Sequence, residues 1–103
     1  MSHTGNRPVG CILANGGTIE IPRGIVANHE VEVGVVIGRK ARAVPASEAM
    51  SYVKGYCLAI DMTARNMQDK VKKAGLPWSA VKGFDTFQPM SDFVCVSLSV
   101  FGL

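Results

Sequence analysis

The segment at residues 29–38 constrains the fold of this chain more than any other stretch of its sequence. It reads HEVEVGVVIG, so Glu30 and Glu32 alternate with valines before a β-branched run. A period of two is typical of a half-buried strand, and β-branched side chains fit a pleated surface. Because successive strand side chains point to opposite faces, we expect the two glutamates to share one face and the valines the other.

Apolar runs predict further strands on either side of this segment. Residues 18–21 alternate apolar and polar side chains, as a half-buried strand does. Residues 56–60 are uniformly apolar, which indicates a buried strand, and this run ends at Asp61. Residues 93–101 form another strand-like run, whereas residues 78–89 carry no clear period.

Two short helices are expected between these strands. The first follows Ser47 as its N-cap and ends near Gly55. The second covers residues 64–73, is capped by Thr63 and stops at Gly75. Together these elements predict an α+β chain that is rich in β-structure and has two short helices.

Length and charge exclude several classes of protein. The 103 residues allow one small domain, and the apolar runs are far shorter than the roughly 20 residues of a membrane-spanning helix. The net charge is only +3. Its two basic clusters are short, as on a solvated surface: Arg39, Lys40, Arg42, Lys70, Lys72 and Lys73. We therefore expect no nucleic-acid partner and no membrane partner.

The cysteines and the first residues bear on the compartment. Cys11, Cys57 and Cys95 are odd in number and form no C-x-x-C pair, so neither a disulfide framework nor a zinc site is indicated. The latter two lie in apolar runs and are expected to be buried. Residues 1–8 show no targeting segment. These features favour a reducing, intracellular location.

Three carboxylates carry the chemical interest of the sequence. Glu30 and Glu32 share a strand face, and Asp61 ends a buried strand. Neighbouring carboxylates repel one another, and a hard divalent cation such as Mg²⁺ would neutralise an all-oxygen cluster. The alternative is a solvated strand face, with Asp61 capping the next segment.

The second helix adds a candidate anion-binding pair. Arg65 and Gln68 are three residues apart and therefore lie on one face of that helix, just after Asp61. Arg65 could hold an anion near whatever Asp61 binds. The alternative is a surface ion pair between Arg65 and Asp69, which are four residues apart.

Three motifs in order resemble the fumarylacetoacetate hydrolase superfamily, most closely its acylpyruvase and oxaloacetate-processing branch. They are HEVEVGVVIGRKARAVP, GYCLAIDMTARNMQDK and GLPWSAVKGFDTFQPM. The resemblance covers residues 17–94, the metal-binding half of such an enzyme. Residues 1–16 form a divergent N-terminal segment, and residues 95–103 form a divergent tail.

The resemblance implies a partial mixed β-roll and, in the full-length family, a homodimer. It implies that Glu30, Glu32 and Asp61 hold Mg²⁺ or Mn²⁺. The Arg and Gln of the TAR-x-x-Q helix, here Arg65 and Gln68, would contact the carboxylate or keto end of a small 2-oxo acid substrate. The lysine before the G-F segment, Lys82, would reach the substrate oxyanion as a catalytic and substrate-binding residue.

The implied reactions are acylpyruvate hydrolysis, oxaloacetate decarboxylation and oxaloacetate keto–enol tautomerisation, in a mitochondrial or cytoplasmic location. Members of this branch are about twice as long. Their water-activating His–Glu pair has no counterpart here, because no H-x-x-E motif precedes Glu30. Their downstream T-G-T-P-x-G-V-G loop is also absent. The alternative is therefore a catalytically inactive truncated fragment that binds a full-length partner by strand addition.

Overall fold

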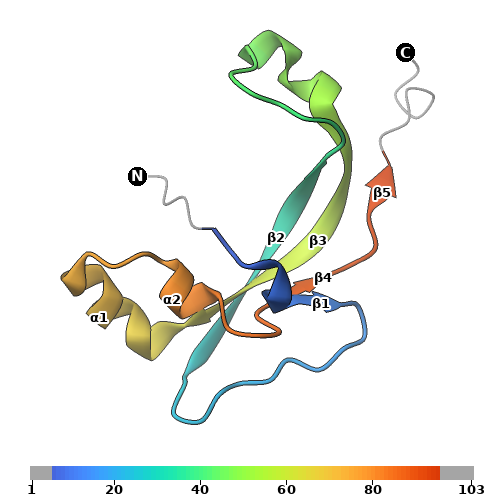
Figure 1. Cartoon of the computed structure of the whole chain (residues 1–103). Helices are drawn as coiled ribbons and strands as arrows, with labels where there is room; N and C mark the ends of the chain where they lie inside the picture. Colours follow the sequence, from blue (N-terminus) through green and yellow to red (C-terminus); the bar gives the residue numbers. More distant parts are fainter. Residues whose placement is uncertain (1–5, 96–103) are drawn as a thin grey trace.

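A long antiparallel hairpin organises the part of the chain that the computed structural model describes, residues 6–95. Its arms are β2 (Ala27–Ile37) and β3 (Val53–Ala64), which run together along much of the molecule (Figure 1). The strand predicted at residues 29–38 is confirmed. The strand predicted at residues 56–60 extends beyond its apolar run at both ends.

The register of this hairpin decides which side chains share a face. Glu30 lies opposite Asp61, and Glu32 lies opposite Ala59. Side chains directly opposite one another in an antiparallel pair point to the same side of the sheet. The two glutamates and Asp61 therefore lie on one face of the hairpin, and the alternating valines of β2 lie on the other.

Three shorter strands complete one mixed sheet. β4 (Gln88–Met90) pairs antiparallel with β3, and β1 (Ile12–Ala14) pairs parallel with β4. β5 (Val94–Cys95) pairs antiparallel with the first part of β3. The strand order is β1-β4-β3-β2, so β2 is an edge strand of the described sheet. The β-rich α+β class is confirmed.

Two α-helices follow β3 at one end of the hairpin (Figure 1). α1 (Arg65–Ala74) begins where β3 ends, and Gly75 ends it in the left-handed conformation with φ of 65°. α2 (Ser79–Lys82) is a single turn. Thr63 does not cap α1 as predicted, because it belongs to β3, and its hydroxyl donates to Asp61 Oδ1 at 3.3 Å instead.

Two 3₁₀ helices complete the elements, η1 (Val9–Cys11) and η2 (Ala46–Tyr52). η2 lies where the first helix is predicted, between the two arms of the hairpin. Ser47 is not its cap, because the helix begins one residue earlier, after Pro45, and no side-chain capping bond forms. Within the described residues, no helix is both long enough and apolar enough to cross a membrane.

The strand predicted at residues 18–21 does not form. This segment is a loop, in which the Glu20 backbone N–H donates to the Thr86 hydroxyl at 2.8 Å and Ile19 packs against the core. A side-chain bond to another loop thus takes the place of a strand ladder. Of the strand-like run at residues 93–101, Phe93 precedes the two-residue strand β5, and residues 96–101 lie outside the described residues.

The core is small and lies where the helices pack against the end of the hairpin. Its buried members share contacts among β3, α1, α2 and the loop after α2: Met62, Ala64, Val71, Val81 and Phe87. Cys57 is buried as predicted, whereas Cys95 is exposed because β5 lies at the end of the described sheet. The core fixes the relative positions of β3 and α2, the two elements that matter most for the site.

Candidate functional site

Three carboxylates converge on one face of the β2–β3 hairpin. Oxygen atoms of Glu30, Glu32 and Asp61 all lie within 4.8 Å of one another. The pairing of Glu30 with Asp61 in the hairpin register places two of them, and alternation along β2 places the third. The glutamates are exposed and Asp61 is half-buried. The structure therefore brings together the three acids that the sequence singles out as metal ligands.

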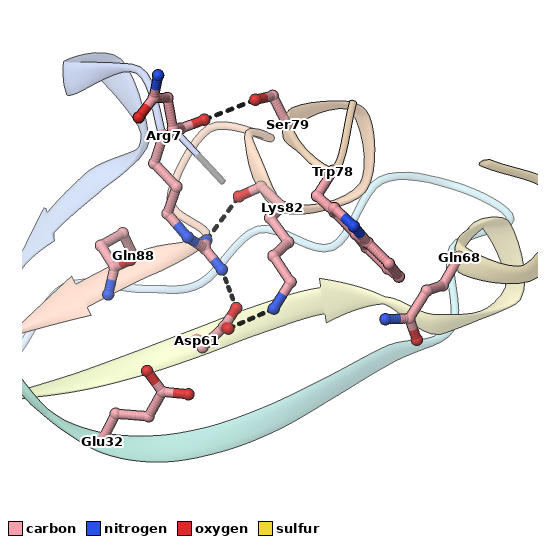
Figure 2. A pocket seen from close by; sticks show the side chains of 9 residues that line it. Arg7, Glu32, Asp61, Gln68, Trp78, Ser79, Lys82 and Gln88 are labelled. Atoms are coloured by element: carbon pink, nitrogen blue, oxygen red, sulfur yellow. Dashed lines mark hydrogen bonds and ion pairs between the residues drawn. The ribbon is translucent and has the colours of Figure 1, made fainter. Parts of the chain in front are cut away.

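Two cations pair with opposite oxygens of Asp61. The Lys82 ammonium, at the end of α2, pairs with Oδ2, and the Arg7 guanidinium pairs with Oδ1 (Figure 2). Lys82 thus lies beside the acidic cluster, where an oxyanion-binding lysine is expected. Its role in catalysis and substrate binding remains a prediction.

Arg7 is a charged residue of the site that the sequence analysis does not predict, because it lies in the segment expected to be divergent. One signal could have pointed to it. Arg7 is the only Lys, Arg, Asp or Glu residue that precedes Glu20. A single charged residue in an otherwise uncharged segment is only a weak indication of a site residue. The contact between Arg7 and Asp61 spans 54 residues, and such a contact produces no periodic pattern in the sequence.

Arg65 and Gln68 lie on one face of α1, as their spacing predicts. The Arg65 guanidinium donates to the Gln68 side-chain oxygen, and it lies 3.8 Å from Glu30. No ion pair joins Arg65 to Asp69 in the described part of the chain, so this alternative is not the observed arrangement. Their contact with a substrate remains a prediction.

A cavity of about 390 Å³ opens beside the acids. Its volume lies within the roughly 300–1,000 Å³ that is usual for small-molecule sites. Figure 2 shows side chains from β2, β3, α1 and α2 around it. The residues that line it are Asn6, Arg7, Glu32, Asp61, Gln68, Trp78, Ser79, Lys82 and Gln88. A small organic acid would meet both charged and neutral polar groups there.

Burial and charge oppose each other at the two cations. Burial lowers the pKa of Lys82 below its ordinary value, against the charge of Glu30, which raises it. Burial likewise lowers the pKa of Arg7, although a guanidinium stays protonated at any physiological pH. Both cations are therefore partly desolvated, which strengthens their attraction for nearby anions.

The donor set fits a hard divalent cation. All three candidate ligands are carboxylates, and Mg²⁺ and Mn²⁺ prefer oxygen donors and retain water ligands. The exposure of Glu30 and Glu32 leaves access for those waters. The donor chemistry therefore supports a metal site at this cluster.

Comparison with known proteins places this arrangement in a family. A family model described as the C-terminal part of fumarylacetoacetate hydrolase matches residues 3–100. The chain belongs to the fumarylacetoacetate hydrolase family. The match includes residues on both sides of the 17–94 segment that carries the motifs.

Two curated relatives are named as enzymes that act on oxaloacetate. The chain is 55% identical over 86 residues to the mitochondrial oxaloacetate tautomerase FAHD1 of Arabidopsis thaliana, covering 82% of the chain and 39% of that relative. It is 48% identical over 90 residues to the mitochondrial oxaloacetate decarboxylase of Dictyostelium discoideum. This match covers 85% of the chain and 41% of that relative. The chain therefore spans about two fifths of the length of these relatives.

Solved structures show the same fold. A fumarylpyruvate hydrolase from Pseudomonas aeruginosa, in complex with Mn²⁺ and pyruvate, matches with a TM-score of 0.78 and 30% identity. That match covers 90% of this chain and 42% of the hydrolase. The yeast protein ynq8 of the same family matches with a TM-score of 0.74 and 35% identity. This match covers 86% of this chain and 45% of ynq8.

Proposed function

We propose that this chain is the metal-binding half of a fumarylacetoacetate hydrolase-type enzyme that acts on a small 2-oxo acid. The observation that carries the proposal is the convergence of Glu30, Glu32 and Asp61 beside the Lys82 ammonium. The candidate reactions are oxaloacetate decarboxylation, oxaloacetate keto–enol tautomerisation and acylpyruvate hydrolysis. The names of the relatives support this set. They also support a mitochondrial location, which we propose for this chain.

Glu30, Glu32 and Asp61 would hold a Mg²⁺ or Mn²⁺ ion. The Mn²⁺ in the solved fumarylpyruvate hydrolase supports this assignment, as does the all-carboxylate donor set. When bound, the ion would act as a Lewis acid for the oxygens of a 2-oxo acid. Lys82 would add a donor and a positive charge where negative charge develops on the substrate. Arg65 and Gln68 would orient a substrate carboxylate.

The charges around the cavity favour a dianionic substrate. The three carboxylates are balanced by three cations nearby, Lys82 and Arg7 on Asp61 and Arg65 near Glu30. A divalent cation adds two positive charges, which a dicarboxylate such as oxaloacetate would neutralise. A monoanion such as acetylpyruvate would neutralise only half of that charge. The site therefore favours a 2-oxo dicarboxylate over a simple acylpyruvate.

Within this set, the one histidine among the described residues supports decarboxylation, which needs no general base, over hydrolysis. Hydrolysis requires an activated water, and a histidine is the most frequent general base. His29 lies next to Glu30 in β2, so its side chain points to the opposite face of the hairpin. The only other histidine, His3, lies outside the described residues.

The metal proposal is tested by the effect of Mn²⁺ on thermal unfolding. A ligand that binds only the folded state stabilises it, by about 2.7 kcal/mol at a concentration 100 times its Kd. Wild-type chain should therefore melt at a higher temperature with Mn²⁺, and Glu32→Ala should abolish this shift. Without metal, Glu32→Ala should be tolerated, since it relieves repulsion. Glu48→Ala, in η2, is the matched control. An undiminished shift in Glu32→Ala would refute the assignment.

A second candidate function is binding to a full-length relative. The exposed face of β2 favours it. Between 53% and 68% of the surface of each of four residues on this face is exposed: Val31, Val33, Val35 and Ile37. β2 is also an edge strand of the described sheet, with backbone groups available for strand addition. An apolar face next to an open edge is typical of a surface that binds another sheet.

We expect this chain to co-elute with the full-length Arabidopsis oxaloacetate tautomerase on size-exclusion chromatography. Val33→Lys should abolish co-elution, because it places a charge in the centre of the apolar face. Met50→Lys adds the same charge at a residue that is 67% exposed in η2, and it should have no effect. The same run tests the homodimer that we propose for the full-length family. If Val33→Lys still co-elutes with the relative, the apolar face of β2 is not the binding surface.

A further inference from the structure

Arg7 joins the acidic cluster to three backbone carbonyls. One terminal nitrogen, Nη1, donates to the carbonyls of Lys82 at 2.6 Å and Phe87 at 2.8 Å. The other, Nη2, donates to the Met62 carbonyl at 3.2 Å. It also pairs with Asp61 (Figure 2). The side chain is only 15% exposed. The guanidinium is therefore held in place from several sides.

Lys82 is held less firmly at the same carboxylate. Its ammonium pairs with Asp61 Oδ2 at the end of a long side chain, which is 21% exposed. A lysine side chain has a flexible stem of four carbons, so its ammonium can move from one partner to another. Arg7 cannot do so without breaking its bonds to three carbonyls, of which only the Phe87 carbonyl has a second donor given by the structure, the Met62 backbone N–H. Of the two cations on Asp61, Arg7 is thus the fixed one.

A fixed positive charge on a metal-ligand carboxylate has two opposite effects. It stabilises three acids that otherwise repel one another at less than 5 Å. It also repels a divalent cation that approaches the same carboxylates. The first effect acts on folding and the second on metal affinity, so the two can be measured separately.

We propose that Arg7 is the built-in counter-cation of the acidic cluster: it holds Asp61 in position and lowers the affinity of the cluster for a divalent cation. This inference rests on the metal site of the proposed function. It makes Arg7 a positioning residue, which leaves Lys82 free to turn toward a substrate when the cluster holds a metal. The same bonds tie the end of α2 to β3, because Arg7 contacts both the Lys82 carbonyl and Asp61.

The sign of the change in metal affinity distinguishes this role from a merely structural one. Loss of structure in Arg7→Met would weaken Mn²⁺ binding, whereas loss of a competing charge would tighten it. We expect the Kd for Mn²⁺ to fall by about tenfold or more. Arg7→Lys, which keeps the charge, should restore the wild-type Kd. Arg23→Met removes an exposed arginine outside the cavity and should change nothing.

Mn²⁺ binding can be followed by the fluorescence of Trp78, the only tryptophan of the chain, which lines the cavity. A folded Arg7→Met protein with an unchanged or higher Kd would overturn the inference. An Arg7→Lys variant whose Kd for Mn²⁺ falls as much as that of Arg7→Met would also overturn it.

A double-mutant cycle in EDTA tests the counter-cation role without metal. Arg7→Met, Asp61→Asn and the double variant are compared by urea unfolding. We expect Asp61→Asn to cost less stability in the Arg7→Met background than in the wild type, because the pair is then already broken. Zero coupling would overturn the Arg7 inference alone. Absence of Mn²⁺ binding in every variant would overturn the metal site itself.

Discussion

Truncation of Phe87 to alanine is expected to destabilise the chain by about 3–5 kcal/mol, the usual cost of emptying a buried aromatic site. Phe87 is completely buried, and its ring packs edge-on against Phe84 with centroids 5.1 Å apart. A chain of this size has a total stability of only about 5–15 kcal/mol. The core has few other large members to compensate. Urea unfolding at 25 °C measures the loss directly.

The same substitution should also disturb the site, because the Phe87 carbonyl accepts bonds from both Arg7 and the Met62 backbone N–H. Displacement of this loop would move the anchor of Arg7. Phe93→Ala is the matched control, since Phe93 is 43% exposed and should cost far less. If both phenylalanines cost the same, the core is not where the structure places it.

The central hairpin and its acids were predictable from the sequence. Alternation over residues 29–38 indicates a strand, and the same alternation places Glu30 and Glu32 on one face. The apolar run before Asp61 indicates its partner strand. Local periodicity carries this information, because each side chain's face depends only on its neighbours in the strand. The three sequence motifs then indicate the family.

The rest of the site depends on contacts that periodicity does not encode. Arg7 reaches Asp61 across 54 residues, and Lys82 reaches it across 21. Residues 78–89 carry no period, yet they contain α2 and the buried Val81 and Phe87. A single helical turn is too short to show a repeat. Its position is set by packing against the end of β3.

The exposed valines of β2 differ most from the sequence expectation of a half-buried strand. Val31 and Val33 are 67% and 68% exposed, because no described element packs over this part of the sheet. Alternation predicts which side chains share a face, but it does not predict whether that face is covered. In relatives that are more than twice as long, further chain is available for that purpose. The apolar face of β2 is therefore the target of the binding experiment.

The reaction preferences of the purified chain follow from the groups that its site contains. With Mg²⁺ present, we expect weak consumption of oxaloacetate above the metal-only rate and no measurable hydrolysis of acetylpyruvate. Positioned general bases contribute about 10²–10⁴-fold, and His29 points away from the acids. Oxaloacetate chemistry needs no activated water, but the exposed glutamates leave the site open to bulk solvent, which weakens electrostatic stabilisation.

Lys82→Met should return oxaloacetate consumption to the metal-only rate, because it removes the cation that would face the developing oxyanion. Asp61→Ala should do the same by removing a metal ligand. Lys40→Met removes an exposed lysine that does not line the cavity and should leave the rate unchanged. Both substrates are assayed at one fixed Mg²⁺ concentration, with the metal-only rate subtracted. Robust acetylpyruvate hydrolysis that disappears in Asp61→Ala would show that this site activates water without a histidine, and the preference for oxaloacetate chemistry would then be wrong.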